Sequence, residues 1–241
     1  MKAVILAAGK GVRLGELVKD RPKPMLEVGG EPVLKYSIEA LAAQGIREIY
    51  INLFYLGEVI RDYFGDGSGL GVKIEYSSEK TLLGTAGGVK KIAGGFKEPF
   101  IVLYGDSFRT VDHKKMEALH RKTASMATIA VYRTPTLERC GIVEFGDDMR
   151  ITGFLEKPLN YAGKSGYANA GAYCLDPRAL ELIPDGVEYD FASQLFPCIL
   201  SRGGKLSAFI LEEPVYDIGV PEDLEKIRSM MGSVGKKGSL R

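Results

Sequence analysis

The sequence predicts an α/β fold, in which a mostly parallel central sheet carries helices on both faces. Short apolar runs of strand length alternate with amphipathic stretches through the first half of the chain. Alternation of this kind is typical of right-handed βαβ units. The first run also ends in a glycine-containing loop, as strands of such sheets do where they bind phosphate. A chain of 241 residues is long enough to bury a large core.

The apolar runs of the first half predict five strands, and the stretches between them predict four helices. The expected strands cover residues 3–6, 48–52, 72–76, 100–103 and 128–132. The expected helices cover residues 33–44, 58–64, 86–92 and 114–122. Gly45 follows the first helix as a natural C-terminal stop.

After Pro135 the pattern changes, and paired strands become more frequent. Residues 141–145 and 150–156 flank Gly-Asp-Asp, which predicts a hairpin. The remaining elements are expected in the order strand 170–175, helices 177–182 and 191–201, strand 205–211 and a helix from 221. We therefore expect one domain over 1–231, with halves at 1–135 and 136–231. The Gly-, Ser- and Lys-rich segment 232–241 is expected to be a disordered tail.

Composition excludes several classes of protein. The net charge is +1 without a basic stripe, which argues against a nucleic-acid partner. No apolar run is long enough to cross a membrane, so no membrane partner is expected. The three cysteines are scattered and form no CxxC pair, which predicts reduced thiols and a cytoplasmic location. His113 and His120 are expected on the surface of one helix, so carboxylates, Lys, Arg, backbone and metal are left to carry the chemistry.

The loop after the first strand is not a dinucleotide loop. Gly9 and Gly11 are followed by Leu14, where the NAD fingerprint needs a third glycine, and an NAD-dependent oxidoreductase is disfavoured on this ground. A Walker loop would need Gly-Lys-Ser/Thr five residues after Gly9, and the sequence has no such triplet there. Backbone N–H groups of residues 8–12 and the side chain of Arg13 instead suit a polyphosphate chain.

A second cation follows this loop, and a carboxylate follows a later strand. Lys23 lies between Pro22 and Pro24, which predict an extended segment. Asp106 ends the apolar run that begins at residue 100. Ligands of open α/β sheets bind outside the carboxyl ends of the strands, so Asp106 is placed to hold Mg²⁺.

Several longer motifs together resemble a known family. In order along the chain they are "LAAGKGVRL", "RPKPMLEVGGEPVL", "LLGTAGG", "LYGDS", "FLEKP", "YANAGAY" and "YDIGVPEDL". They resemble the sugar-1-phosphate nucleotidylyltransferases (NDP-sugar pyrophosphorylases), most of all the short guanylyltransferases that act on mannose 1-phosphate or D-glycero-D-manno-heptose 1-phosphate. Two positions differ from the usual family pattern. Val12 stands where the family usually has Thr, and the aromatic residue before Asp-Ile-Gly, often Trp in the family, is Tyr216 here.

The resemblance implies a reaction and a fold. An NTP, with GTP expected, and a sugar 1-phosphate would give an NDP-sugar and pyrophosphate, with Mg²⁺ as cofactor. The fold would be the Rossmann-like nucleotide-diphospho-sugar transferase fold. Residues 1–135 would then form the nucleotide-binding half, and 136–231 a small β-rich sugar-binding part with a closing helix.

The resemblance also implies roles for individual residues. The catalytic residues would be Arg13, Lys23, Asp106 and Lys157. The nucleotide would be bound by Leu6, Ala8, Gly9, Gly11, Arg13, Lys23, Glu79, Gly84, Thr85 and Asp106. The sugar phosphate would be bound by Gly141, Glu156, Lys157 and Asn169, and the metal by Asp106 and Asp217. Gly84 would let the base approach the backbone, and Gly141 would leave room for the sugar ring. Glu79 is our own addition, as an acceptor for the guanine N1–H and amino group.

Two alternatives stay open. The chain could be a glucose-1-phosphate uridylyl- or thymidylyltransferase, or a non-catalytic regulatory paralogue that binds a nucleotide-sugar. The catalytic charges are all present, which favours the enzyme. The sequence leaves the base, the sugar and the formation of a homo-oligomer open.

Overall fold

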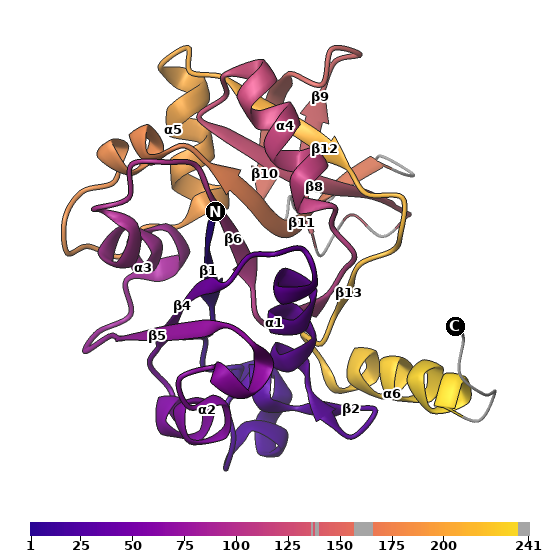
Figure 1. The fold of residues 1–241 in the computed structure, drawn as a ribbon. Coiled ribbons are helices and arrows are strands. Elements are labelled where there is room, and N and C mark those ends of the chain that lie inside the picture. Colours follow the sequence, from indigo (N-terminus) through magenta and orange to yellow (C-terminus); the bar gives the residue numbers. More distant parts are fainter. Residues whose placement is uncertain (136, 138–139, 157–165, 236–241) are drawn as a thin grey trace.

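Four parallel strands form the first half of the central sheet. The computed structural model describes residues 1–135, 137, 140–156 and 166–235 (Figure 1). The strands are β1 (Lys2–Leu6), β4 (Glu48–Leu53), β5 (Lys73–Ser78) and β6 (Phe100–Tyr104), in the spatial order β5-β4-β1-β6. The chain runs outward from β1 to β5 and then returns to β6 on the other side of β1. The carboxyl ends of β1 and β6 therefore meet at a topological switch point, where ligands bind in open α/β sheets.

The second half of the sheet is mainly antiparallel. Strand β11 (Gly166–Leu175) pairs antiparallel with β6, with β8 (Ala127–Thr134) and with β9 (Gly141–Phe145). Strand β9 forms the predicted hairpin with β10 (Ile151–Glu156), and β12 (Leu206–Ile210) runs parallel to β8. The expected strands are thus confirmed, and the sheet is parallel around β1 and antiparallel around β11.

Helices cover both faces of the sheet, as predicted (Figure 1). One face packs on α1 (Val33–Ala43), α2 (Gly57–Phe64) and α4 (His113–Thr123). The other face packs on α3 (Gly84–Ala93), on a π-helical turn (Phe191–Leu195) and on α5 (Phe196–Ser201). Both cores are built from aliphatic and aromatic side chains that exclude water, which is the main source of stability in such a layered fold.

Short elements complete the chain. Two-stranded sheets are formed by β2 (Glu27–Val28) with β3 (Glu31–Pro32), and by β7 (Ser107–Phe108) with β13 (Tyr216–Asp217). Short 3₁₀ elements lie at Val12–Val18, Lys23–Met25, Ser68–Leu70 and Pro177–Leu182. Helix α6 (Pro221–Gly235) projects from the body beside β2, with Leu224 and Ile227 buried (Figure 1). It includes residues 232–235 of the expected tail, whereas residues 236–241 lie outside the described residues.

Two local expectations, for the histidines and for Lys23, were wrong. His113 and His120 share one face of α4 as their spacing predicts, but this face is buried, and His120 contacts Thr128 of β8. The helix expected over 177–182 is confirmed, as a 3₁₀ helix that Pro177 begins. Lys23 begins a 3₁₀ turn over Lys23–Met25 because a proline is tolerated in the first turn of a helix.

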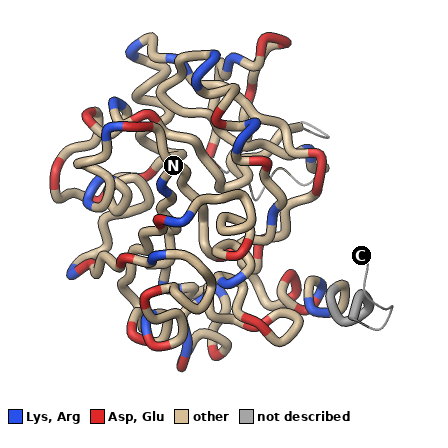
Figure 2. Tube along the Cα trace, in the orientation of Figure 1, with Lys and Arg blue, Asp and Glu red and all other residues tan. Residues whose placement is uncertain are grey.

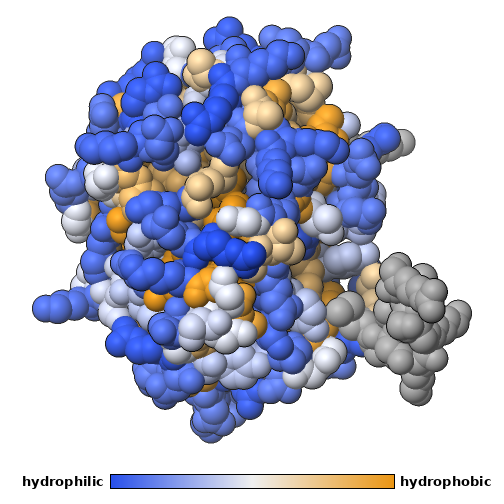
Figure 3. Space-filling view, in the orientation of Figure 1, coloured by the Kyte–Doolittle hydropathy of each residue, from blue (hydrophilic) through white to orange (hydrophobic). Residues whose placement is uncertain are grey.

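Charged residues of both signs alternate along the chain, and Figure 2 shows no stripe of one sign. In Figure 3 hydrophilic residues cover most of the visible face, and paler apolar residues gather across its middle. No helix in the described part of the chain has the length and apolar character that crossing a bilayer requires.

Candidate active site

One lysine joins two carboxylates at the carboxyl edge of the sheet. Lys23 Nζ donates to Asp106 Oδ2 at 2.6 Å and to Asp217 Oδ1 at 3.0 Å. The Lys23 side chain is 10% exposed, against 27% for Asp106 and 56% for Asp217. We call these three residues the lysine–carboxylate cluster. Three residues far apart in the sequence thus converge on one point beside the switch point.

The β7–β13 pair brings the two aspartates together. Asp217 lies opposite Ser107 in this pair, and Ser107 directly follows Asp106. Gly105 N donates to Leu6 O at 2.9 Å, which fixes the Asp106 loop against the end of β1. A Cβ at Gly105 would lie 3.0 Å from that same Leu6 oxygen, so glycine permits this close approach.

The charges of the cluster shift its titration. Burial disfavours the charged form of Lys23, but the two carboxylates outweigh this effect and raise its pKa. Burial likewise acts against the Asp106 carboxylate, but the Lys23 charge and hydrogen bond hold the pKa of Asp106 below its ordinary value. Partial desolvation and the nearby Asp106 charge raise the pKa of Asp217. Asp217 is therefore the less strongly paired of the two carboxylates.

The first glycine loop packs directly on Lys23. Gly11 has φ of +64°, and a Cβ there would lie 3.3 Å from Lys23 Cβ and from Val18 Cγ1. Arg13 is exposed, and a Cβ at Gly219 would lie 3.5 Å from Arg13 Nη2 and 2.9 Å from Asp217 Oδ2. The loop, Arg13 and the lysine–carboxylate cluster therefore form one continuous site.

Other members of the predicted nucleotide site line the same loop. Leu6 ends β1, Ala8 is buried, and a Cβ at Gly9 would meet no atom within 4 Å. The backbone at Gly9 is therefore open to a ligand, as a phosphate-binding loop requires.

The donor set of the cluster fits a hard divalent cation. The two carboxylates already share one cationic group, and carboxylate oxygens are the ligands that Mg²⁺ prefers. The described residues hold no group of three or more His, Cys, Asp or Glu side chains suited to a metal. Mg²⁺ typically takes one or two carboxylates and completes its shell with phosphate oxygens and water.

The second glycine loop is shaped by the protein itself. Gly84 has φ of +70°, and a Cβ there would lie 2.6 Å from Tyr189 O, so the Tyr189 backbone occupies the space expected for a base. Tyr189 O also accepts from the N–H groups of Ala86 and Gly87. Thr85 Oγ1 donates to Asp190 Oδ2 at 2.6 Å and accepts from Phe191 N. Both motif residues thus dock the loop onto the segment before α5.

Glu79 also has a different setting from the one expected. It is 8% exposed, and its two oxygens accept from Asn52 Nδ2 at 2.8 Å and from Leu83 N at 3.0 Å. Each oxygen thus accepts one hydrogen bond within the protein, and the expected contact of Glu79 with guanine stays a prediction.

The predicted acceptor residues come from the antiparallel half. Gly141 and Glu156 are directly opposite in the β9–β10 pair, and a Cβ at Gly141 would lie 2.7 Å from Glu156 Oε2. The space at Gly141 is therefore taken by the Glu156 carboxylate rather than left for a sugar ring. Asn169 lies at a β-bulge of β11, where it accepts from Gly171 N and donates to Tyr173 OH at 2.8 Å. Lys157 lies outside the described residues.

Sequence reasoning missed three residues of this region. Asn52 links β4 to Glu79, Asp190 holds Thr85, and Arg109 donates to the carbonyls of Tyr104 and Ser107 on either side of Gly105-Asp106. For Asn52 the signal was a polar side chain at the end of an apolar strand. Asp190 carried no signal, because its partner lies 105 positions away in the chain.

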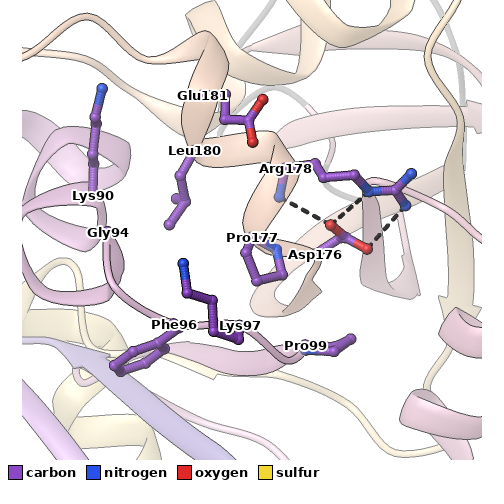
Figure 4. Close-up of a pocket in the computed structure, with 10 residues that line it drawn as sticks. All are labelled: Lys90, Gly94, Phe96, Lys97, Pro99, Asp176, Pro177, Arg178, Leu180 and Glu181. Carbon is purple, nitrogen blue, oxygen red and sulfur yellow. Dashed lines mark hydrogen bonds and ion pairs between the residues drawn. The ribbon is translucent and has the colours of Figure 1, made fainter.

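A cavity of about 470 Å³ lies at the opposite edge of the sheet (Figure 4). It is bounded by the end of α3, the start of β6 and the 3₁₀ helix after β11, and none of the predicted site residues lines it. Lys90 pairs with Asp185, and Arg178 pairs with Asp176. Two of the three cations that line the cavity are thus already paired with a carboxylate of the protein.

Comparisons with known proteins identify the family of the chain. Residues 2–232 match the family model described as nucleotidyl transferase. The chain is 36% identical to a UTP–glucose-1-phosphate uridylyltransferase of Synechocystis sp., over 96% of this chain and 63% of that protein. It is 33% identical to a mannose-1-phosphate guanylyltransferase of Mycobacterium tuberculosis, over 92% and 62%. The chain therefore spans less than two thirds of the length of these two relatives.

Other similar proteins are matched along almost their whole length. A D-glycero-alpha-D-manno-heptose 1-phosphate guanylyltransferase of Campylobacter jejuni is 34% identical, over 92% of this chain and 96% of that protein. The crystal structure of HddC from Yersinia pseudotuberculosis complexed with GMP-PN is similar with a TM-score of 0.80 and 29% identity, over 95% and 98%. The likeness thus extends over both halves of the sheet.

Proposed function

The chain belongs to the nucleotidyl transferase family, and we propose that it transfers a nucleotidyl group from an NTP to a sugar 1-phosphate, releasing pyrophosphate. The single observation that carries this proposal is the lysine–carboxylate cluster beside an open glycine loop at the switch point of the sheet. Relatives named uridylyltransferase and guanylyltransferase support the same class of reaction.

The residues of the site have distinct tasks in this reaction. The backbone at Gly9 and the Arg13 side chain would bind the triphosphate, while Lys23 would neutralise charge that builds as pyrophosphate departs. Asp106 and Asp217 would hold Mg²⁺, which, when bound, would neutralise the phosphates and orient them. The attacking sugar phosphate is already anionic at neutral pH, so no general base is needed. Catalysis would then consist of positioning and charge neutralisation.

For the substrates, we propose GTP and a manno-configured sugar 1-phosphate. The relative from Campylobacter jejuni, matched over 96% of its length, is named for manno-heptose 1-phosphate, and the similar Yersinia structure holds GMP-PN. The relative from Synechocystis sp. is named for UTP and glucose 1-phosphate, so this pair of substrates is the alternative. Gly141, Glu156, Lys157 and Asn169 are proposed to face the sugar phosphate.

The test offers the purified protein each NTP with mannose, manno-heptose and glucose 1-phosphates, with and without Mg²⁺. Pyrophosphate release with GTP and a manno-configured acceptor, abolished by a chelator, is the expected result. Full turnover in chelator, or phosphate as the product, would contradict the mechanism. Binding of an NDP-sugar without turnover of any pair would favour the regulatory paralogue.

We further propose a cytoplasmic location, with no nucleic-acid or membrane partner. No disulfide joins Cys140, Cys174 and Cys198, all of which lie in the described part of the chain. Reduced thiols suit a reducing compartment.

A further inference from the structure

Arg109 folds back over the loop that carries Asp106. Its side chain follows β7 and donates through Nη2 to Tyr104 O and through Nη1 to Ser107 O, the latter at 3.4 Å. These two carbonyls stand on either side of Gly105-Asp106, so one guanidinium group spans the turn between β6 and β7. Because a guanidinium presents its donors in a rigid plane, it holds the two carbonyls at a set separation.

Neighbouring elements hold the same turn from two other sides. Gly105 N donates to Leu6 O of β1 at 2.9 Å, and Ile218 N donates to Asp106 O at 3.4 Å. Both of these contacts reach the middle of the turn, whereas Arg109 holds its two ends. The direction in which the Asp106 side chain leaves the backbone is therefore set by the three contacts together.

The hydrogen bonds of Arg109 serve this turn. In the part of the chain that the structure describes, the guanidinium donates to the two carbonyls, and its buried Nε has no hydrogen-bond partner. Burial lowers the pKa of Arg109 to about 10, against the attraction of the Asp106 charge, so the group is a cation at neutral pH. A buried charge is often no more stabilising than an apolar side chain of similar volume. Stability alone therefore does not explain an arginine at this place.

We propose that Arg109 is a positioning residue, which shapes the turn so that the Asp106 carboxylate can bind Mg²⁺ together with Asp217. The proposal rests on the proposed function, because that function assigns the metal to these two carboxylates. Asp106 Oδ2 lies 2.6 Å from Lys23 Nζ, and Asp106 Oδ1 accepts from Ser107 Oγ at 3.3 Å. Both contacts depend on the course of the backbone through the turn. Loss of the guanidinium should therefore weaken the binding of metal more than the metal-free binding of nucleotide.

Two substitutions separate the paired donors of Arg109 from its charge. Arg109→Met keeps most of the length of the side chain and removes both the charge and the donors. Arg109→Lys keeps the charge, but one ammonium group lacks the planar fork that spans two carbonyls. Arg178→Met is the matched control, because Arg178 donates twice to Asp176 beside the cavity at the opposite edge of the sheet. Asp106→Asn, alone and with Arg109→Met, completes a double-mutant cycle.

For each protein we measure the affinity for Mn²⁺ alone by electron paramagnetic resonance, and the thermal midpoint. We also measure the dissociation constant of a nonhydrolysable GTP analogue with and without Mg²⁺. In both Arg109 variants the Mn²⁺ affinity should fall about tenfold, while metal-free binding of the analogue changes less than about twofold. Mg²⁺ should also tighten analogue binding less than it does in the wild type. In the Asp106→Asn background Arg109→Met should have no further effect on metal, and Arg178→Met should bind like the wild type.

The failure of the proposed function is distinguishable from the failure of this proposal. If the wild type releases no pyrophosphate, the proposed function fails, and the Mn²⁺ affinities still test Arg109. If Arg109→Met does not fold, Arg109→Lys decides.

Five outcomes overturn the proposal. A wild type whose readouts do not respond to metal would remove the metal site itself. Equal weakening of analogue binding with and without Mg²⁺ would mean that Arg109 contacts the phosphates directly. Wild-type metal binding in Arg109→Lys would show that the charge alone is sufficient. A lowered midpoint with wild-type metal binding would reduce Arg109 to a structural role. Additive losses in the double-mutant cycle would show that Arg109 does not act through Asp106.

Discussion

In the parallel half of the molecule, the loops after β1, β5 and β6 are tied to one another by hydrogen bonds that involve backbone groups. Ala7, Leu83 and Gly105 each donate a backbone N–H into this network. In the antiparallel half, the Glu156 carboxylate lies against Gly141 across one strand pair, and Asn169 lies at a bulge. Substitutions should therefore differ in kind: those of the buried groups that hold the loops of the parallel half should affect folding and nucleotide together, and those in the antiparallel half should affect mainly the acceptor.

The largest effect is expected at Lys23. Lys23→Ala removes a preorganised cation from the place where negative charge builds as pyrophosphate departs. Turnover should therefore fall by a factor on the order of 10²–10³. It also leaves two carboxylates side by side without their lysine, so the free energy of unfolding should fall by about 2 kcal/mol. Turnover and a thermal melt with and without Mg²⁺ check both effects, and Mg²⁺ should raise the midpoint of the variant more than that of the wild type.

Arg13→Ala is the matched control, because Arg13 is exposed and its loss leaves the Asp106–Lys23 contact intact. The turnover of this variant should also fall by a factor on the order of 10²–10³, while its thermal midpoint should not change. Lys23 is only 8% exposed, so of the two variants only Arg13→Ala is expected to keep full stability. Near-normal turnover in folded Lys23→Ala protein would remove Lys23 from the mechanism.

Two glycines, one in each half, give the next comparison. Gly84→Ala forces a side chain onto a residue at φ +70° and places its Cβ 2.6 Å from a backbone oxygen, so it should cost about 2–4 kcal/mol of stability. Gly141→Ala meets the far end of the flexible Glu156 side chain at 2.7 Å and the edge of the Phe154 ring at 3.1 Å, at an ordinary backbone conformation, so it should cost less, about 1–2 kcal/mol. Chemical denaturation of both variants measures the difference.

Enzyme kinetics should show that Gly141→Ala affects the acceptor alone. Gly141→Ala displaces the Glu156 carboxylate, so the acceptor KM should rise while the KM of the NTP stays constant. Equal stability losses in the two variants would contradict the idea that the halves are anchored differently.

The fold was largely predictable because the βα half repeats a local pattern. Each apolar run gave a strand, and the neighbouring parallel strands β1 and β6 carry Gly9 and Asp106 beyond their carboxyl ends, where expected. The neighbours of Glu79 and Gly84 were not predictable, because Asn52 and Tyr189 reach them only after the sheet and α5 are assembled. The burial of His113 also depended on which face of α4 meets the sheet, and the spacing of the residues does not specify this.

A smaller effect is expected at Lys157, for which the expectation rests on the sequence and the family. Lys157→Ala removes the cation assigned to the sugar phosphate, so the acceptor KM should rise about tenfold while the KM of the NTP changes less than about twofold. Initial rates measured against each substrate in turn test this. An effect confined to the NTP would move Lys157 out of the acceptor site.

The smallest effect is expected at Glu156, and it tests the comparison most finely. Glu156→Gln keeps the size of the side chain and its place opposite Gly141, but removes the negative charge. A carboxylate that binds a sugar hydroxyl makes a stronger hydrogen bond than a neutral amide, so the acceptor KM should rise about threefold. The effect should be lost when the test acceptor lacks the hydroxyl that Glu156 binds, which a series of deoxysugar 1-phosphates can identify. The melt and the KM of the NTP should stay at wild-type values, because Glu156 belongs to a strand pair outside the hydrogen-bonded loops of the parallel half. A parallel rise in the KM of both substrates would mean that the two halves act as one rigid site, and the distinction between them would then fail.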